Sequence, residues 1–508
     1  MFLPLPTPKE MSAWDRDTIR TIGIPGMTLM ENAGREALAV LLEDFGDVSG
    51  MEIHLFAGAG NNGGDAFAMA RHLADLDADV TVFHTRSKKK YTGETRTNLE
   101  LCRKLNIPLL HLGSVNLEAL PQPDIIVDGL LGTGFEGELR EDYLQLVRTI
   151  NRLGERAYVF AIDIPSGLNG LTGHPQPDAV RADATATFQA AKIGLIGPQA
   201  EEYTGDLFVC SIGIPRLVQE KLPPRRWMIS DAIFKQLPLS EPDMHKGQAG
   251  HVLVVGGSEG LTGAPHLAAL GALRAGAGLV TVACPTPLAD AIKAGTPEIM
   301  GLPIGANRQW DASDADLIAG HLERFDAVVI GPGLGRSRKT VDFLKGLVAR
   351  CPLPVVLDAD ALFCLAQVPG LLESLSDNVV LTPHPGEMSM LTGRTSANVQ
   401  DDRIGTAEEF IRNTAATLVL KGSCTIVADN QRTCISPISA PTLAVGGSGD
   451  VLAGLIGSLL GRRMTPFMAS CLGVYWHATA GLLLEEQYPS RGNLAREIAA
   501  MLPEAVKE

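Results

Sequence analysis

The sequence predicts two α/β domains, each built on a mainly parallel β-sheet. The chain has 508 residues, which is too many for a single hydrophobic core. Apolar, strand-like runs alternate with helix-like stretches in both halves, as is typical of parallel α/β sheets. The alternation lapses between residues 215 and 243, where prolines and charged residues dominate. We therefore expect no strand there and place the boundary inside this segment, with domains at 1–222 and 227–508.

The first half contains five candidate strands, with a clear helix between the first two. The helix is DAFAMARHLADL (65–76), which carries small and apolar residues on one side. The strands are EIHLFAG (52–58), DVTVFHT (79–85), DIIVDGL (124–130), YVFAIDIP (158–165) and DATATFQA (183–190).

The second half restarts the pattern after the boundary segment. Its candidate strands are HVLVVGG (251–257), GLVTVAC (278–284), DAVVIGPG (326–333), PVVLDAD (354–360), NVVLTPHPG (378–386) and TLVLKGSCTIVA (417–428). The motifs of the two halves do not align as a repeat, so we expect two different α/β domains rather than a duplication.

Two apolar segments near the end of the sequence are predicted to be buried helices. The first is VLAGLIGSLLG (451–461). The second, MTPFMASCLGVYWHATAGLLL (464–484), is long enough to span a membrane. Pro466 lies near its start, His477 lies within it, and small residues are frequent. These features favour core helices of a large α/β domain, so we expect no membrane partner.

Composition and charge narrow the class of function. The net charge of −15 and the pI of about 5.3 argue against a nucleic-acid or anionic-membrane partner. The eight cysteines include no C-x-x-C pair, which indicates neither a zinc site nor a disulfide framework and fits a reducing cytoplasm. The first 17 residues show no signal-peptide pattern. We therefore expect a cytoplasmic protein with small-molecule ligands.

Polar residues follow the candidate strands of the first domain. Ligands of open parallel sheets bind beyond the carboxyl ends of the strands, so these residues should gather at one edge. The loop GAGNNGGD (58–65) is rich in glycine, but it is not a clean G-x-G-x-x-G fingerprint, and a tight turn explains it equally well. Asn62, Asp128 and Ser166 would supply oxygen ligands for a hard cation, although these residue types also form turns.

A carboxylate and an amine are expected at the same edge. Asp163 precedes a proline after the fourth strand and is a candidate general acid or base, with a loop-bracing role as the alternative. Lys192 follows the fifth strand.

Four motifs follow one another in the first half. They are MENAG (30–34), GNNGGD (60–65), DGLLGTGF (128–135) and DIPSGL (163–168). Together they resemble the NAD(P)H-hydrate epimerases over nearly all of residues 1–220, and the resemblance implies a Rossmann-like, three-layer α/β fold.

The resemblance also implies the ligands of the first domain. The residues matching the family's potassium ligands are Asn62, Asp128 and Ser166, and Asp163 would contact the nicotinamide end. There we expect Asp163 to assist departure and return of the hydroxyl while the ring nitrogen supplies electrons. This chain has Ala66 where the family usually has glycine, which raises the question whether the loop is narrowed. The implied substrate-binding residues are Asn61, Asn62, Gly63, Gly64, Asp65, Gly132, Thr133, Gly134, Phe135, Glu136, Gly137, Glu138 and Asp163.

The stretch GGSGDVLAG (446–454) allows two interpretations from its residues alone. Asp450 is a suitable N-cap for the apolar helix that follows. Alternatively, the glycine N–H groups bind a phosphate at the start of this helix, and Asp450 stands beside it as a base.

Four further glycine loops of the second domain suit a nucleotide, although each one alone is a common turn. Within them, Lys421 either reaches a phosphate or an adenine or is an ordinary surface lysine. His384 is held rigidly between two prolines, which favours a ligand contact. For Glu387 a helix cap is favoured over a role in organising magnesium. The loops are GGSEGLTGAP (256–265), GPGLG (331–335), TPHPGE (382–387) and KGSCT (421–425).

The order of these motifs resembles the ADP-dependent NAD(P)H-hydrate dehydratases over residues 240–505. The resemblance implies a ribokinase-like fold, Mg²⁺ and ADP. Asp450 would be the base that takes the proton from the ring hydroxyl of the hydrate as this oxygen attacks the phosphoryl group. The implied hydrate contacts are Ala264, Gly333, His384 and Asp450. The implied nucleotide contacts are Lys421, Gly422, Ser423, Cys424, Thr425 and Gly449.

The two resemblances together predict a bifunctional repair enzyme. It would epimerise R- and S-NAD(P)HX and dehydrate the S form to NAD(P)H, giving AMP and phosphate from ADP, and we expect a homo-oligomer. The main alternative is a ribokinase-like kinase for a vitamin-type alcohol, fused to a dinucleotide-binding regulatory domain. That kinase would release a stable phosphorylated product. The sequence does not distinguish NADHX from NADPHX or ADP from ATP.

Overall fold

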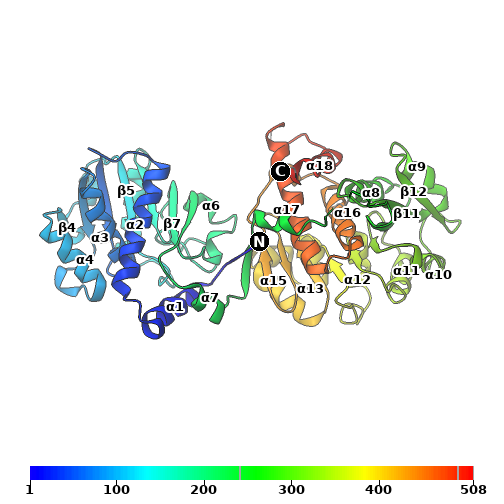
Figure 1. Cartoon of the computed structure of the whole chain (residues 1–508), viewed down its shortest axis with the longest axis horizontal. Helices are drawn as coiled ribbons and strands as arrows, with labels where there is room; N and C mark the ends of the chain where they lie inside the picture. Colours follow the sequence, from blue (N-terminus) through cyan, green and yellow to red (C-terminus); the bar gives the residue numbers. More distant parts are fainter. Residues whose placement is uncertain (240–241, 489–490, 507–508) are drawn as a thin grey trace. The chain divides into compact units, whose positions relative to one another are not determined.

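The computed structural model describes residues 1–239, 242–488 and 491–506. The chain divides into two compact units (Figure 1). One is Pro4–Arg226, and the other combines Met1–Leu3 with Trp227–Glu508. The first three residues therefore belong to the C-terminal unit, whereas the boundaries expected from the sequence place them in the N-terminal domain.

A seven-stranded parallel sheet forms the centre of the N-terminal unit. Its strand order is β4-β3-β2-β5-β6-β7-β8. The direction of winding reverses between β2 and β5, and such a switch point opens a ligand crevice at the carboxyl ends of the strands. The strands are β2 (Glu52–Ala57), β3 (Asp79–His84), β4 (Leu109–His111), β5 (Ile125–Gly129), β6 (Tyr158–Ile162), β7 (Ala184–Phe188) and β8 (Asp206–Cys210).

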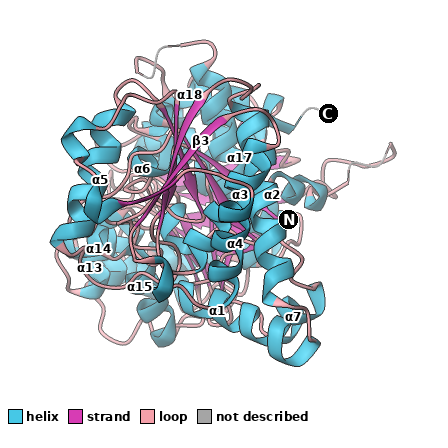
Figure 2. Ribbon diagram, turned by 90° about the vertical axis from the view of Figure 1, so that its left-hand side faces the viewer, coloured by secondary structure: helices cyan, strands magenta, loops and turns pink. Residues whose placement is uncertain are grey.

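Helices cover both faces of this sheet, which confirms the three layers expected from the sequence (Figure 2, helices cyan and strands magenta). Side chains alternate along a strand, so Ile125 and Val127 pack against α2 and α3 while Ile126 packs against α5 on the other face. The helices are α1 (Pro8–Asp17), α2 (Gly26–Asp44), α3 (Asn61–Ala74), α4 (Gly93–Lys104), α5 (Glu141–Gly154), α6 (Glu201–Thr204) and α7 (Arg216–Lys221).

The C-terminal unit contains an eleven-stranded mixed sheet in the order β1-β9-β18-β17-β16-β15-β14-β13-β10-β11-β12. The seven strands from β16 to β12 in this order are parallel, while β16, β17 and β18 pair antiparallel. The strands are β1 (Phe2–Pro4), β9 (Arg226–Ile229), β10 (His251–Val255), β11 (Leu279–Pro285), β12 (Ile299–Ile304), β13 (Ala327–Ile330), β14 (Val355–Leu357), β15 (Val379–Leu381), β16 (Thr417–Leu420), β17 (Ile426–Ala428) and β18 (Thr433–Ile435).

Two of these strands correct the expectations from the sequence. The segment 215–243 does contain a strand, β9, whose pairing with β1 was invisible because the two segments lie more than 200 residues apart. The run 417–428 is a hairpin of β16 and β17 with the KGSCT turn between them.

The C-terminal unit has eleven helices among its described residues. They are α8 (Gly263–Arg274), α9 (Ala289–Lys293), α10 (Asp314–Ala319), α11 (Arg338–Val348), α12 (Asp360–Ala366), α13 (Pro385–Thr392), α14 (Ser396–Asp401), α15 (Arg403–Phe410), α16 (Ser448–Gly461), α17 (Pro466–Glu485) and α18 (Ala495–Met501).

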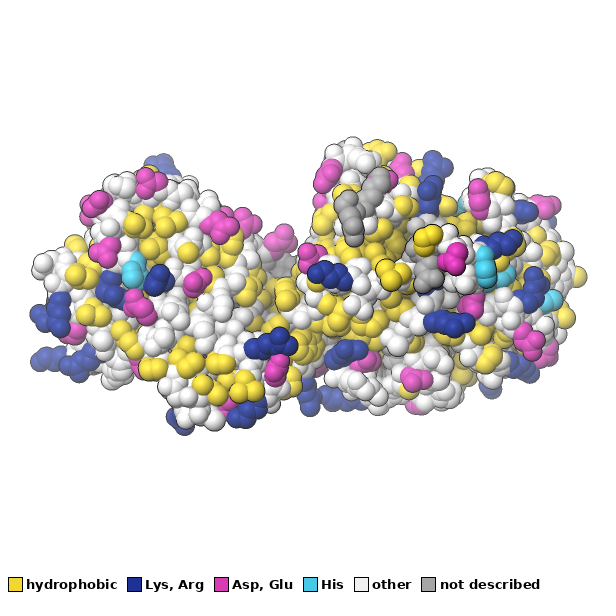
Figure 3. Space-filling model, viewed as in Figure 1, with side chains coloured by type: hydrophobic (Ala, Val, Ile, Leu, Met, Phe, Trp, Pro, Cys, Tyr) yellow, Lys and Arg dark blue, Asp and Glu magenta, His cyan; other side chains and the backbone are white. Residues whose placement is uncertain are grey.

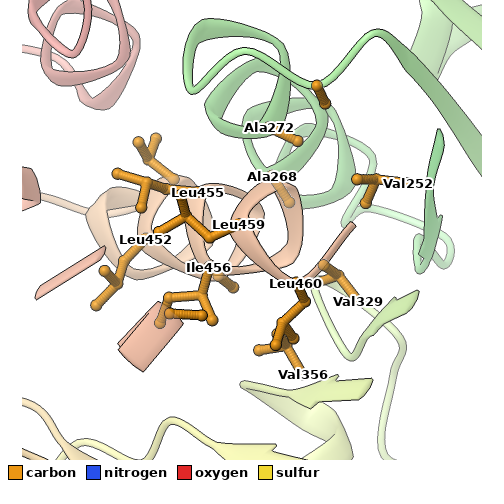
Figure 4. Packing of buried hydrophobic residues seen from close by; sticks show 14 of the residues in the cluster. Val252, Ala268, Ala272, Val329, Val356, Leu452, Leu455, Ile456, Leu459 and Leu460 are labelled. Atoms are coloured by element: carbon orange, nitrogen blue, oxygen red, sulfur yellow. The ribbon is translucent and has the colours of Figure 1, made fainter. Parts of the chain in front are cut away.

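The two apolar segments are buried helices, as predicted. Helix α16 packs against α8 and against the valine side chains of one face of the sheet (Figure 4). Helix α17 alone among the described helices is long and apolar enough to cross a membrane, and 72% of that stretch is buried inside the protein. A helix that is apolar on all sides is the expected element for such a position.

Glycines bring α8 and α16 into close contact. A methyl group added at Gly454 would stand 1.8 Å from the carbonyl oxygen of Ala268. Because the backbone has to move to relieve this clash, we expect Gly454→Ala to lower the free energy of unfolding of the C-terminal unit by about 1–3 kcal/mol or more, measured by denaturant unfolding. Gly263→Ala is the matched control, since nothing lies within 4 Å of the added carbon. Equal stability of the two variants would contradict this packing.

Charged side chains of both signs lie on the face drawn in Figure 3. There, Lys and Arg side chains are interspersed with Asp and Glu rather than gathered over one element. This distribution, together with the net charge of −15, is unlike the basic footprint of a nucleic-acid-binding surface.

Candidate functional sites

The N-terminal unit contains a cavity of about 560 Å³ at the switch point of its sheet. Loops after β2, β5 and β6 reach it, and α1 and α2 supply further walls. Of the thirteen residues expected to bind substrate, nine line the cavity: Asn61, Asn62, Asp65, Gly132, Thr133, Gly134, Phe135, Glu136 and Asp163.

The other four expected substrate contacts do not line this cavity: Gly63, Gly64, Gly137 and Glu138. For two of them the structure shows a packing role. A methyl group at Gly63 would stand 2.0 Å from the carbonyl oxygen of Gly58, and one at Gly64 would stand 2.4 Å from the Met30 side chain. These glycines let the start of α3 approach the strand ends closely, which a sequence motif cannot separate from ligand contact.

Asp163 and Lys192 form a buried ion pair in the cavity. The Lys192 Nζ atom donates to Asp163 Oδ1 at 2.6 Å, and Thr133 donates to Asp163 Oδ2 from its backbone N at 3.1 Å and its Oγ1 at 2.8 Å. Burial alone would raise the pKa of Asp163, but Lys192 and the Thr133 donors outweigh burial and hold the pKa below its ordinary value. Asp163 is therefore an anion at neutral pH.

Two further carboxyl groups line this cavity, and the negative charge of Asp163 raises the pKa of both. Burial, followed by the negative charge of Asp163, raises the pKa of Asp15 to about 6. The same two causes raise the pKa of Asp65 well above its ordinary value. Asp65 lies in the NNGGD motif, but no motif pointed to Asp15, which comes from α1 and lines the cavity only because the chain folds back over the strand ends.

The three expected cation ligands lie in one network. Ser166 donates to Asp128 from its backbone N and from its Oγ, both at 2.7 Å, and Asn62 Nδ2 donates to the carbonyl oxygen of Leu131 at 2.7 Å. Leu131 N in turn donates to Ser166 Oγ at 2.9 Å. Asp128 is fully buried, and burial raises its pKa to about 6. Asn62 Oδ1 is buried and has no hydrogen-bond partner among the described residues.

Ala66 does not narrow the cavity. It is fully buried and is not among the lining residues. A methyl group at Gly129 would stand 2.6 Å from the Ala66 Cβ, so Ala66 faces β5 at a position where the absent side chain of Gly129 leaves room.

The C-terminal unit contains a second cavity, of about 600 Å³, beyond the carboxyl ends of β14, β15 and β16. Seven of the ten expected contacts line it: His384, Lys421, Gly422, Ser423, Thr425, Gly449 and Asp450. The three that do not are Ala264, Gly333 and Cys424. Ala264 and Gly333 are neighbours, since a methyl group at Gly333 would stand 3.4 Å from the Ala264 Cβ.

The charges of Asp358 and Lys421 act on Asp450. It lies in the first turn of α16 and lines the cavity, and a methyl group at neighbouring Gly449 would stand 3.1 Å from Lys421 Nζ. Burial, followed by the charge of Asp358, raises the pKa of Asp450 to about 8, although Lys421 opposes both. No side-chain cap was found at the start of α16, so the N-cap interpretation of Asp450 has no support.

Asp358 was not expected from the sequence and organises the lysine. It is almost fully buried, and its Oδ1 accepts hydrogen bonds at 2.7 Å from both Lys421 Nζ and Thr382 Oγ1. Burial opposes the charged form of Lys421, yet Asp358 and Glu387 hold the pKa of Lys421 above its ordinary value. A signal was present in the sequence, because Asp358 follows a predicted strand as Asp128 and Asp163 do.

Glu387 acts as a helix cap, the role favoured from the sequence. Its Oε2 accepts the backbone N–H of His384 at 2.8 Å, and His384 Nδ1 accepts that of Gly386 at 3.0 Å. These bonds form the reciprocal cap of α13 and fix His384 at the cavity.

Arg403, at the start of α15, holds the KGSCT turn. Its guanidinium donates at 3.2 Å to the carbonyl oxygens of Leu420 and Lys421, and also to that of Ser423.

His477 of α17 lines the C-terminal cavity, and burial lowers its pKa to about 4, so it is neutral at physiological pH. The roles of Arg403 and His477 were not predicted. The sequence shows no motif around Arg403, and the apolar run around His477 is typical of a core helix.

Comparisons with known proteins give a match for each of the two units. The family model described as YjeF-related protein N-terminus matches residues 26–194, and that described as NAD(P)H-hydrate dehydratase matches residues 252–504. A bifunctional NAD(P)H-hydrate repair enzyme from Moorella thermoacetica is 40% identical, over 98% of this chain and 96% of its own length. One from Coxiella burnetii is 36% identical, over 94% of each chain.

Solved structures resemble about half of the chain. A ribokinase-like superfamily protein from Enterococcus faecalis is 24% identical, covers 56% of this chain and 95% of its own, and has a TM-score of 0.49. An ADP/ATP-dependent NAD(P)H-hydrate dehydratase from Bacillus subtilis is 27% identical, covers 54% and 94%, and has a TM-score of 0.46.

Proposed function

Because the chain belongs to the family of bifunctional NAD(P)H-hydrate repair enzymes, we propose that each unit carries one of the two activities. The N-terminal cavity interconverts the R and S hydrates of NADH and NADPH. The C-terminal cavity dehydrates the S hydrate and converts ADP to AMP and phosphate. A homo-oligomer and a cytoplasmic location stay predictions from the sequence.

The observation that carries the dehydratase proposal is that Asp450, at the start of a buried helix, lines the same cavity as Lys421. Asp450 takes the proton of the ring hydroxyl while that oxygen attacks the terminal phosphoryl group. Lys421 and the N–H groups of the first turn of α16 stabilise the charge that develops on the phosphoryl oxygens. Elimination of the phosphate then restores the dihydropyridine ring.

Magnesium would enter this site with the nucleotide. Among the described residues no group of three His, Cys, Asp or Glu side chains is suited to hold a metal ion. Magnesium at phosphoryl-transfer sites is commonly held by substrate phosphates, water and one or two carboxylates, and Asp358 and Asp450 are the carboxylates that line this cavity.

The pH dependence of dehydration follows from Asp450. A base must be ionised to accept a proton, and the pKa of Asp450 lies at about 8 in the free protein. We expect kcat/KM to rise about tenfold per pH unit below pH 8 and to level off above it, measured with nucleotide in excess. A flat profile between pH 6 and pH 8 would contradict the role of Asp450.

A potassium ion fits the N-terminal network. The orphaned Asn62 Oδ1, the buried Asp128 carboxylate and the Ser166 hydroxyl are oxygen donors of the kind that hard cations prefer. We propose that these three residues bind K⁺, whose charge would compensate the buried carboxylate.

Potassium should therefore stabilise the N-terminal unit. At a concentration 100 times its Kd it would add about 2.7 kcal/mol, which thermal unfolding in KCl against tetramethylammonium chloride at equal ionic strength would detect. Asp128→Asn should remove the difference. A stabilisation that persists in Asp128→Asn would place the ion elsewhere.

The test of the whole function is recovery of the absorbance of reduced nicotinamide from a mixture of R and S hydrates with Mg²⁺, K⁺ and ADP. Complete recovery supports both activities, and a sharp slowing after half of the substrate means that epimerisation is absent. A stable phosphorylated product without recovery would favour a small-molecule kinase. No recovery with ADP or ATP would reject the dehydratase assignment.

A further inference from the structure

The N-terminal cavity contains a carboxyl that no motif assigns and that the chemistry of epimerisation needs. Asp15 lines the cavity from α1, apart from the strand-end loops that supply Asp163 and Lys192. We propose that Asp15 is a catalytic residue of the epimerase, the proton donor to the departing hydroxyl group; this inference rests on the proposed epimerase function.

Asp163 is unsuited to be that donor. Both of its oxygens accept hydrogen bonds, from Lys192 on one side and from Thr133 on the other. A carboxylate that accepts three such bonds is held as an anion. Its charge instead stabilises the positive charge that forms on the nicotinamide ring when the hydroxyl leaves.

Asp15 does not accept the hydrogen bonds that hold Asp163 as an anion. Among the described residues, no hydrogen bond joins Asp15 to Asp163 or Lys192, although both charges act on it. The other charged or titratable groups of the cavity wall are Asp65 on α3, Glu94 on α4, Glu136 and Tyr143. A pKa of about 6 lets Asp15 exist in both protonation states near neutral pH, whereas the pKa of Asp65 is raised well above its ordinary value.

The position of Asp15 is fixed by its helix. The neighbouring Trp14 is fully buried, and its Nε1 donates to the carbonyl oxygen of Leu222 at 2.7 Å. Thr7 and Glu10 form a capping box at the start of α1. Met11, Ser12 and Asp15 consequently present one side of the helix to the cavity, at spacings expected for one helical face.

The reaction balances with these groups and one water molecule. Asp15 gives its proton to the hydroxyl oxygen, the C–O bond breaks, water leaves, and the ring nitrogen lone pair forms a C=N bond. Water then adds to the other face of the ring, the C=N pair returns to nitrogen, and the added water releases one proton to solvent. Asp15 takes up a proton from solvent, and the enzyme is restored.

The test uses the full-length protein, pure R hydrate and no ADP, with the S epimer measured by chromatography so that dehydration cannot interfere. We expect Asp15→Asn to lower kcat at least about 100-fold with KM changed less than threefold, and Asp15→Glu to restore part of the rate. Asp17→Asn is the matched control, since Asp17 lies on the same helix, is paired with Lys221 and does not line the cavity. It should retain the wild-type rate.

The pH profile separates proton donation from a structural role. The wild-type kcat/KM should fall above pH 6 as Asp15 loses its proton, and the residual rate of Asp15→Asn should lack this decline. An Asp15→Asn rate within threefold of wild type, or an unchanged pH profile, overturns the inference and leaves the epimerase function intact. A wild-type protein that does not interconvert the epimers overturns both.

Discussion

Replacing Asp450 by asparagine is expected to lower kcat for dehydration by about 10³-fold or more while leaving the affinity for ADP almost unchanged. General-base catalysis contributes about 10²–10⁴-fold, and an amide cannot accept the proton. The measurement is restoration of reduced-nicotinamide absorbance from S hydrate, with nucleotide binding followed by calorimetry.

Loss of folding would not explain such a result. The pKa of Asp450 is raised by burial, so the folded protein disfavours its charged form, and the uncharged asparagine should not lower the free energy of unfolding. Asp342→Asn is the matched control, because Asp342 is exposed on α11 and does not line the cavity. Dehydration by Asp450→Asn at more than a tenth of the wild-type rate would assign the base to another residue.

Replacing Lys192 by methionine is expected to damage both the stability and the activity of the N-terminal unit. Lys192 is 1% exposed and holds Asp163 at 2.6 Å, so its loss leaves a buried carboxylate without its counter-charge. Breaking such a pair costs about 3–5 kcal/mol. Epimerisation should fall at least about 100-fold, since Asp163 would no longer be held as an anion.

Lys221→Met provides the comparison for Lys192→Met. The Lys221–Asp17 pair has a similar length, 2.8 Å, but the lysine side chain is 52% exposed. Exposed pairs contribute about 0–1 kcal/mol, so unfolding should shift little and epimerisation should be retained. Equal losses of stability in the two variants would mean that the buried Lys192–Asp163 pair contributes no more to stability than an exposed pair.

The strand ends were the most predictable part of the sites. Asn62, Asp128, Asp163 and Lys192 all follow predicted strands, and parallel sheets bring such positions to one edge whatever the helices do. The same rule explains why Lys421 and His384 share a cavity.

Residues from outside the strand ends could not be predicted in this way. Asp15 reaches its cavity because Trp14 anchors α1, and His477 reaches its cavity from the middle of an apolar helix. Both depend on tertiary packing, which leaves no periodic signal. Gly63 and Gly64 show the opposite case: a motif predicts ligand contact at positions where the structure shows close packing.

Strand β1 gives the order of synthesis a consequence for folding. Phe2, in β1, packs its ring against Phe467, and the neighbouring strand β9 is made only after nearly all of the N-terminal unit has been synthesised. At about 5–20 residues per second, β1 stays without its partners for ten seconds or more. Strand β18, the other neighbour of β9, follows about 200 residues after β9. A gene fragment that begins at residue 227 would therefore encode the second enzyme without β1, the edge strand of its sheet. A protein fused before residue 1 would be attached at that sheet edge, in the C-terminal unit, although the N-terminal unit follows it in the sequence.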